Sequence, residues 1–152
     1  MSDTRYIYEG NTFHNINVTP INYVPEFFAL EIDLESDVFY EMRKNNNITP
    51  HRLNQSSLKE LNDIKEFFDK NKSTFFFLFN GNELIGSILI LRNYIQALSI
   101  AKKYQQQSYG TKLTKYAINF ILNRGYRCVE LNVLDGNIPA HRLYVKLGFK
   151  EL

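Results

Sequence analysis

The chain has 152 residues, of which 44% are hydrophobic, and a formal net charge of +2. The length predicts a single domain over residues 1–152 with a sizeable core, and the apolar fraction argues against a disordered chain. The longest apolar run is too short to cross a bilayer, and the N-terminus lacks the apolar segment of a secretory signal. One cysteine, Cys128, excludes an internal disulfide framework. We therefore expect a cytoplasmic protein without a membrane partner.

Charge is divided unequally along the chain. Residues 1–70 contain 7 Lys or Arg against 12 Asp or Glu, whereas residues 71–152 contain 11 against 4. The basic second half suits a polyanionic ligand. Its basic residues are dispersed and no nucleic-acid motif accompanies them, so we expect no nucleic-acid partner. The histidines lack metal-ligand spacing, which predicts no metal site, and His141 is expected to be an exposed helical residue.

The first half of the chain predicts one strand and two helical segments. We place the strand at about 15–21 and helical character over 25–44. A clearer helix is predicted over 57–70, where Ser57 and Glu60 have the spacing of a capping box.

Three strands joined by short turns come next. Residues 74–79 are almost entirely apolar and are followed by Asn80-Gly81, a dipeptide typical of hairpin turns. The second arm of the hairpin is predicted at 83–91, and a third strand at 95–100.

The last third predicts a helix, a strand and a second helix. The first helix covers about 109–123 and the strand 127–134; the second helix is capped by Asn137 and stopped by Gly148. Together the elements predict an α/β (α+β) fold, in which about four helices flank a mixed central sheet.

The loop between the third strand and the following helix is the most informative segment. It reads Tyr-Gln-Gln-Gln-Ser-Tyr-Gly-Thr-Lys-Leu over residues 104–113. The first N–H groups of a helix lack intrahelical partners and lie at the positive end of its dipole, so they can bind an anion. Gly110 has no Cβ to hold a phosphate away. An ordinary strand–loop–helix connection is the alternative.

Two motifs favour the anion-binding loop over an ordinary connection. Gln105-x-x-Ser108-x-Gly110 resembles the pyrophosphate-binding signature of the GCN5-related N-acetyltransferase (GNAT) superfamily, and the segment from Asn137 to Phe149 resembles the next motif of that family. The resemblance covers roughly residues 74–150. It implies the GNAT fold and acetyl-CoA as co-substrate.

The resemblance also implies a set of cofactor-binding residues. Strand atoms would pair with the pantetheine amides, the loop would hold the pyrophosphate, and the last helix would contribute two side chains. These residues are Leu98, Ser99, Ile100, Gln105, Gln106, Gln107, Ser108, Tyr109, Gly110, Thr111, Lys112, Asn137 and Tyr144. Ser108 stands where the family prefers glycine, so a positive φ there would cost about 1 kcal/mol.

Tyr144 is the candidate catalytic residue, because the family often uses a tyrosine at this position as the acid that protonates the departing thiolate. A packed core aromatic is the alternative. The general base is less obvious, because many relatives have a glutamate where this chain has Gln96. The substitutes are acids elsewhere, namely Glu31, Asp33, Glu35 and Glu83. A water chain or an amine that is already neutral could also serve.

These features predict an N-acetyltransferase that moves an acetyl group from acetyl-CoA to a primary amine by direct transfer. Six acids between Glu26 and Glu41 would attract a cationic small-molecule or peptide amine, unless they form a solvated helix face. A non-catalytic acyl-CoA-binding or interaction module is the alternative function.

The C-terminal end is short relative to the family, whose members usually continue with a further strand. Residues 6–8 and 12–18 are strand-like and precede the usual first strand. We expect this extension to fill the vacant sheet edge, either within the same chain or in the partner of a homodimer.

Overall fold

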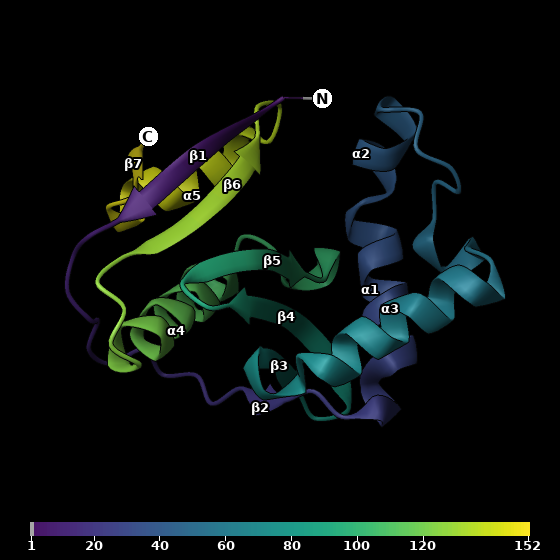
Figure 1. Cartoon of the computed structure of the whole chain (residues 1–152), viewed down its shortest axis with the longest axis horizontal. Helices are drawn as coiled ribbons and strands as arrows, with labels where there is room; N and C mark the ends of the chain where they lie inside the picture. The colour runs from purple at the N-terminus through teal and green to yellow at the C-terminus, as the bar shows by residue number, and fades with distance from the viewer. Residues whose placement is uncertain (1) are drawn as a thin grey trace.

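The structure is a computed structural model that describes residues 2–152 as a seven-stranded mixed sheet with helices on both faces (Figure 1). The strands are β1 (Asp3–Tyr8), β2 (Ile21–Asn22), β3 (Phe75–Asn80), β4 (Glu83–Leu91), β5 (Tyr94–Ile100), β6 (Val129–Leu134) and β7 (Lys150–Glu151). The α-helices are α1 (Phe28–Val38), α2 (Tyr40–Asn45), α3 (Leu58–Lys70), α4 (Tyr109–Asn123) and α5 (Ile138–Leu147). The sheet order is β2-β3-β4-β5-β6-β1-β7, so the predicted mixed sheet is confirmed.

Local sequence signals set most element boundaries. Ser57 caps α3 by accepting a hydrogen bond from the Glu60 N–H, as the capping box predicts. β3 and β4 form the predicted antiparallel hairpin, and Gly81 in its turn has φ +60°, a conformation that glycine adopts without a Cβ clash. Helix α4 has the predicted bounds.

The prediction of a strand over 15–21 is wrong, and so is strand character over 12–18. Within this stretch only Ile21 pairs in the sheet, through the two-residue strand β2. Asn15 and Asn17 have φ values of +56° and +62°, which lie in the left-handed region and break an extended strand. The backbone of Phe13 instead exchanges two hydrogen bonds with the Asn119 side chain on α4.

The helical segment expected over 25–44 is divided into three pieces. A short 3-10 helix covers Pro25–Phe27, and α1 and α2 are separated at Phe39. Phe39 has φ −99° and ψ 6°, outside the helical range, so the chain changes direction there. The division raises the number of α-helices to five.

Two hydrophobic cores lie on the opposite faces of the sheet. One core joins α1 and α3 to the first half of the sheet and includes Phe77 and Phe68. The other joins α4 and α5 to the sheet and includes Ile118 and Tyr144. Alternating residues of β3 supply both cores, as Phe76 and Phe77 show, which explains why this strand is apolar throughout.

The N-terminal strand lies inside the sheet, within the same chain. β1 pairs antiparallel with β6 over six positions and with β7 on its other side. Tyr6 and Tyr8 of β1 are buried, and Tyr8 packs between Phe13 and Phe149. The extension therefore fills the edge beside β6 without a second copy of the chain.

No helix within residues 2–152 combines the length and the apolar character that a bilayer crossing requires.

Candidate active site

Strands β5 and β6 separate at the centre of the sheet. They run parallel but pair only at Tyr94 opposite Glu130, next to a 2.9 Å hydrogen bond from the Glu130 N–H to the Asn93 carbonyl. Beyond that point the two strands diverge (Figure 1). The sequence-predicted residues Leu98, Ser99 and Ile100 lie on the divergent part of β5. This edge of β5 therefore presents backbone groups that β6 does not pair.

A β-bulge precedes this free edge. Leu89 pairs with Ala97 and Ile90 pairs with Ile95, so Gln96 is the extra residue on β5. Bulges redirect side chains and occur often beside active sites. Here the bulge leaves Gln96 exposed on the face of the sheet that carries α1.

The predicted anion-binding loop connects β5 to the uncapped end of α4. Ser108 is the N-cap residue of α4, but its side chain makes no capping hydrogen bond. The side chains of Gln105 and Gln107 instead bond backwards, to the carbonyls of Ile100 and Lys103. The first N–H groups of α4 consequently keep their capacity to bind an anion.

Two residues of this loop adopt left-handed backbone conformations. Ser108 has φ +71° and Gln106 has φ +61°. The positive φ anticipated at Ser108 is present. It carries a cost of about 1 kcal/mol for a residue with a Cβ.

Gly110 is not required by its own backbone conformation. A Cβ added there would meet only ordinary contacts, with Leu143 at 3.7 Å, Leu98 at 3.8 Å and Ile100 at 3.9 Å. The missing side chain therefore leaves space between β5 and α5 at the start of α4.

The lysines of this region differ in whether their ammonium groups are free to bind an anion. Lys103 forms an ion pair with Glu83 at 3.0 Å, and the Tyr104 hydroxyl donates a hydrogen bond to the same carboxylate. These contacts lower the pKa of Glu83, the hydroxyl of Tyr104 having the largest effect, so Glu83 is a poor proton acceptor. Lys112 lies with its Nζ 5.6 Å from the centre of the Tyr109 ring, beside the first turn of α4.

Helix α5 places the other two sequence-predicted residues. Asn137 caps α5 by accepting a hydrogen bond from the Ala140 N–H at 3.3 Å. Tyr144 is 7% exposed and packs edge-to-face on Phe149, and its hydroxyl makes no hydrogen bond within residues 2–152. Burial raises the pKa of its phenol, which therefore stays protonated at neutral pH.

His141 is not the exposed residue that the sequence suggested. It is half-buried, with Nδ1 2.6 Å from the Tyr6 hydroxyl and Nε2 3.0 Å from the Leu134 carbonyl. Strand β1 creates this environment, because it brings Tyr6 against α5.

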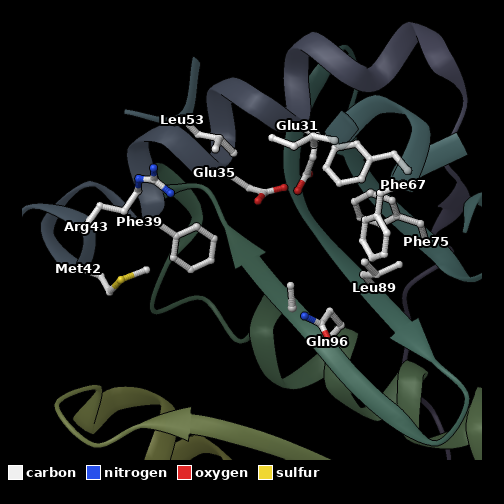
Figure 2. Close-up of a pocket in the computed structure, with 13 residues that line it drawn as sticks. Glu31, Glu35, Phe39, Met42, Arg43, Leu53, Phe67, Phe75, Leu89 and Gln96 are labelled. Atoms are coloured by element: carbon white, nitrogen blue, oxygen red, sulfur yellow. The ribbon is translucent and has the colours of Figure 1, made fainter. Parts of the chain in front are cut away.

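A cavity of about 290 Å³ lies between α1, α2, α3 and the bulged part of β5 (Figure 2). Most of the lining side chains are apolar, and four of them are polar or charged. The lining residues are Glu31, Glu35, Phe39, Met42, Arg43, Leu53, Ile64, Phe67, Phe68, Phe75, Leu89, Gln96 and Ala97.

Two carboxyl groups point toward one another in this cavity (Figure 2). Glu31 and Glu35 are one helical turn apart on α1, and Glu31 is only 2% exposed. One oxygen of Glu31, Oε1, is buried and has no hydrogen-bond partner within residues 2–152.

Burial raises the pKa of both carboxyls. The pKa of Glu31 lies well above its ordinary value, first because burial disfavours its charged form and then because Glu35 is adjacent. The pKa of Glu35 is also raised by burial, although its hydrogen bond with Glu31 opposes the rise. Of the four acids considered as the general base, Glu31 and Glu35 line the same cavity as Gln96.

The remaining acids of the first helices do not form a wall around this cavity. Asp33 and Asp37 are exposed, and they contact Asn54 and Arg52, respectively. Glu26 and Glu41 are also exposed. The interpretation of a solvated helix face is correct for these four. The i,i+4 spacing of Glu31 and Glu35 puts both on one face of a helix, but Asp33 and Asp37 have the same spacing, so spacing alone does not distinguish the buried pair.

A model of the acetyltransferase (GNAT) family matches residues 35–149. The chain belongs to this family. The divergence of β5 from β6, the Ser108 loop and the Asn137 cap are thus features of a GNAT domain.

Individual relatives match a shorter stretch of the chain. N-alpha-acetyltransferase 30 of Schizosaccharomyces pombe is 39% identical over 59 residues, which are 39% of this chain and 39% of that protein. The probable N-acetyltransferase camello of Xenopus tropicalis is 37% identical over 57 residues, or 38% of this chain and 26% of that protein. The chain thus matches well under half of the length of either relative.

Solved structures share the GNAT fold over nearly the whole chain. PH1933 from Pyrococcus horikoshii has a TM-score of 0.65 at 21% identity, covering 97% of this chain and 90% of that one. The paia N-acetyltransferase from Thermoplasma acidophilum, solved in complex with coenzyme A, has a TM-score of 0.60 at 18% identity, covering 88% and 90%. At these identities the likeness shows the fold alone.

Proposed function

We propose that this GNAT domain is an N-acetyltransferase that moves an acetyl group from acetyl-CoA directly to a primary amine, without a covalent intermediate. The proposal depends mainly on one observation. The unpaired edge of β5 leads, through the loop of residues 101–108, to the N-terminus of α4, which no side chain caps. An extended strand edge suits an amide-containing arm, and a free helix N-terminus suits a phosphate.

The residues fit acetyl-CoA in two ways. Backbone groups of Leu98, Ser99 and Ile100 would bind the pantetheine arm as a neighbouring strand would, and the space beside Gly110 leaves room for it. The N–H groups from Ser108 to Thr111 would bind the pyrophosphate, with the Lys112 ammonium beside them. Acetyl-CoA supplies the activated acetyl group.

Two residues of α5 would act at the reacting end. Tyr144 holds a proton at its phenolic oxygen and has no competing hydrogen bond, so it can donate to a developing thiolate. Asn137 retains one amide N–H₂ group after capping α5, which can bind the pantetheine arm. The acceptor is an amine of a small molecule or of a peptide.

Calorimetric titration with acetyl-CoA, and with ATP as the control ligand, tests the proposal. We expect micromolar binding of acetyl-CoA and much weaker binding of ATP. Ser108→Glu and Ser108→Gln form a matched pair, because both keep a Cβ at the left-handed position and only one adds a negative charge. Ser108→Glu should weaken acetyl-CoA binding at least tenfold more than Ser108→Gln. Equal binding of ATP and acetyl-CoA would overturn the proposal.

A further inference from the structure

The cavity against α1 has a chemical character of its own. Its walls are aromatic and aliphatic, from Phe39 on one side to Phe67, Phe68 and Phe75 on the other. A cavity of about 150 Å³ lined by such residues is sufficient to bind benzene. A volume of about 290 Å³ therefore accommodates an aromatic ring with a short alkyl arm.

The polar groups of the cavity are few and are gathered around Glu31. Glu35 faces it from the same helix (Figure 2), and the buried hydroxyl of Ser87 on β4 lies within hydrogen-bond reach of the Glu31 carboxyl. Arg43 of α2 lines the cavity as its only cation, and its one side-chain hydrogen bond within residues 2–152 goes to the Pro50 carbonyl. The hydroxyl of Tyr23 is buried nearby and lacks a partner within residues 2–152; burial, and then the charges of nearby acids including Glu31, raise the pKa of Tyr23 to about 12, so it is a neutral neighbour.

An unpartnered oxygen on a side chain that is 98% buried costs free energy unless a ligand completes its hydrogen bonding. Glu31 Oε1 is such an atom, and its carboxyl faces the cavity (Figure 2). A donor with several N–H bonds would satisfy it together with Glu35. A primary ammonium group has three such donors.

We propose that the Glu31–Glu35 pair is the amine-binding end of an acceptor site for a primary amine carried on an apolar, aromatic-sized body, and that the pair removes the proton of this amine. This inference rests on the proposed acetyl transfer and names its acceptor class and its base. Gln96, across the cavity, accepts or donates a hydrogen bond but cannot take the proton.

The proton transfer balances within the site. An alkyl ammonium has a pKa near 10.4 in water, so the amine enters as a cation. One N–H bond of the ammonium breaks and one O–H bond forms on the carboxyl pair. The products are a neutral amine, whose lone pair can attack an acyl carbon, and a carboxyl pair that holds the added proton.

The charges favour one ammonium group and disfavour a second. Two adjacent buried carboxyls cannot both be ionised cheaply, so the pair offers about one negative charge. Arg43 would repel another cation in the same cavity. A polyamine therefore fits this site worse than a monoamine with an aromatic body.

The experiment measures binding without acetyl-CoA, so that it is independent of catalysis. Calorimetric titration of the whole chain at pH 7.5 would use 2-phenylethylamine as the probe and spermidine as the polycationic comparison. The variants are Glu31→Gln, Glu35→Gln and the control Asp33→Asn, which changes an exposed acid on the same helix. Thermal unfolding of each variant reports whether it is folded.

We expect 2-phenylethylamine to bind at least tenfold more tightly than spermidine, and Glu35→Gln to weaken its binding at least tenfold while Asp33→Asn leaves it unchanged. Once an acetyl acceptor is in hand, the same pair variants should lower kcat and shift the acid limb of its pH profile. Tighter binding of spermidine, or equal 2-phenylethylamine affinity in Glu35→Gln and Asp33→Asn, would overturn the inference. Amine binding without any acetyl transfer would instead overturn the proposed function alone.

Discussion

The hydroxyl of Tyr6 and Nδ1 of His141 share a hydrogen bond of 2.6 Å, which joins the N-terminal strand to the last helix. The Leu134 carbonyl accepts from Nε2 on the other side of the ring, 3.0 Å away. Because a carbonyl can only accept, Nε2 carries a proton in this arrangement. Tyr6 lies on β1, the strand that fills the sheet edge, and its bond to His141 also holds α5, the helix that carries Tyr144, in place.

Replacing Tyr6 by Phe should lower the free energy of unfolding by about 1 kcal/mol, since the half-buried His141 loses its hydrogen bond with the Tyr6 hydroxyl. Urea unfolding followed by circular dichroism measures the change. Tyr126→Phe is the matched control, because Tyr126 is 39% exposed and should change stability by less than about 0.5 kcal/mol. An equal effect of the two substitutions would show that the bond adds nothing.

Removing residues 2–12 should destabilise the chain severely, because β1 lies between β6 and β7 and its buried tyrosines form part of the core. Tyr8→Ala tests the same relationship within the full chain. It should lower the free energy of unfolding by about 3 to 5 kcal/mol, as aromatic truncations in cores do. A truncated chain with unchanged thermal stability would contradict this placement of β1.

Replacing Ser108 by Gly should stabilise the protein by about 1 kcal/mol, since glycine adopts φ +71° without the Cβ cost and no capping bond is lost. Thr111→Gly, in the first turn of the same helix, should instead destabilise it by about 1 kcal/mol. Thermal and urea unfolding measure both. A loss of stability in both variants would contradict the backbone strain at Ser108.

The carboxyl pair predicts a specific dependence of stability on pH. A carboxyl whose pKa is higher in the folded state binds its proton more tightly there, so its contribution to stability falls as pH rises above the unfolded value of about 4.3. Glu31→Gln removes one such group. The free energy of unfolding of the variant, relative to that of the parent protein, should therefore increase with pH, by at most about 1.4 kcal/mol per pH unit for one proton.

Urea unfolding at intervals from pH 4.5 to pH 8 measures this difference. Asp33→Asn is the control, because it removes an exposed carboxyl from the same helix. A flat difference between the parent protein and Glu31→Gln would indicate that Glu31 is ionised in the folded state.

Replacing Tyr144 by Phe should lower the rate of amine-dependent thiol release from acetyl-CoA by tenfold or more, since general acids contribute about 10²- to 10⁴-fold. The ring would keep its packing on Phe149, so the affinity for acetyl-CoA and the thermal stability should stay close to those of the parent protein. An unchanged rate would assign Tyr144 a packing role only.

The elements that could be predicted from the sequence are those with local causes. The hairpin around Gly81 follows from an Asn-Gly turn between apolar runs, and the bounds of α4 follow from its apolar face. The GNAT resemblance marked Ser108 as a position where a positive φ would be costly, and the structure shows that φ is positive there. The strand predicted over 15–21 failed because Asn15 and Asn17 take conformations that strand propensity does not report.

Local sequence thus specified the hairpin, the Ser108 loop and the cap of α5, because turns, caps and helix starts depend on neighbouring residues. The sequence predicted that the N-terminal extension fills a sheet edge. Only the tertiary structure showed that β1 does so within the same chain, between β6 and β7, because pairing between distant segments leaves no local pattern of register or partner. It also separated Glu31 and Glu35 from the four exposed acids around them. All six looked alike along the chain, and the burial that raises the pKa values of these two depends on the aromatic side chains of α3 and β3 packed around them.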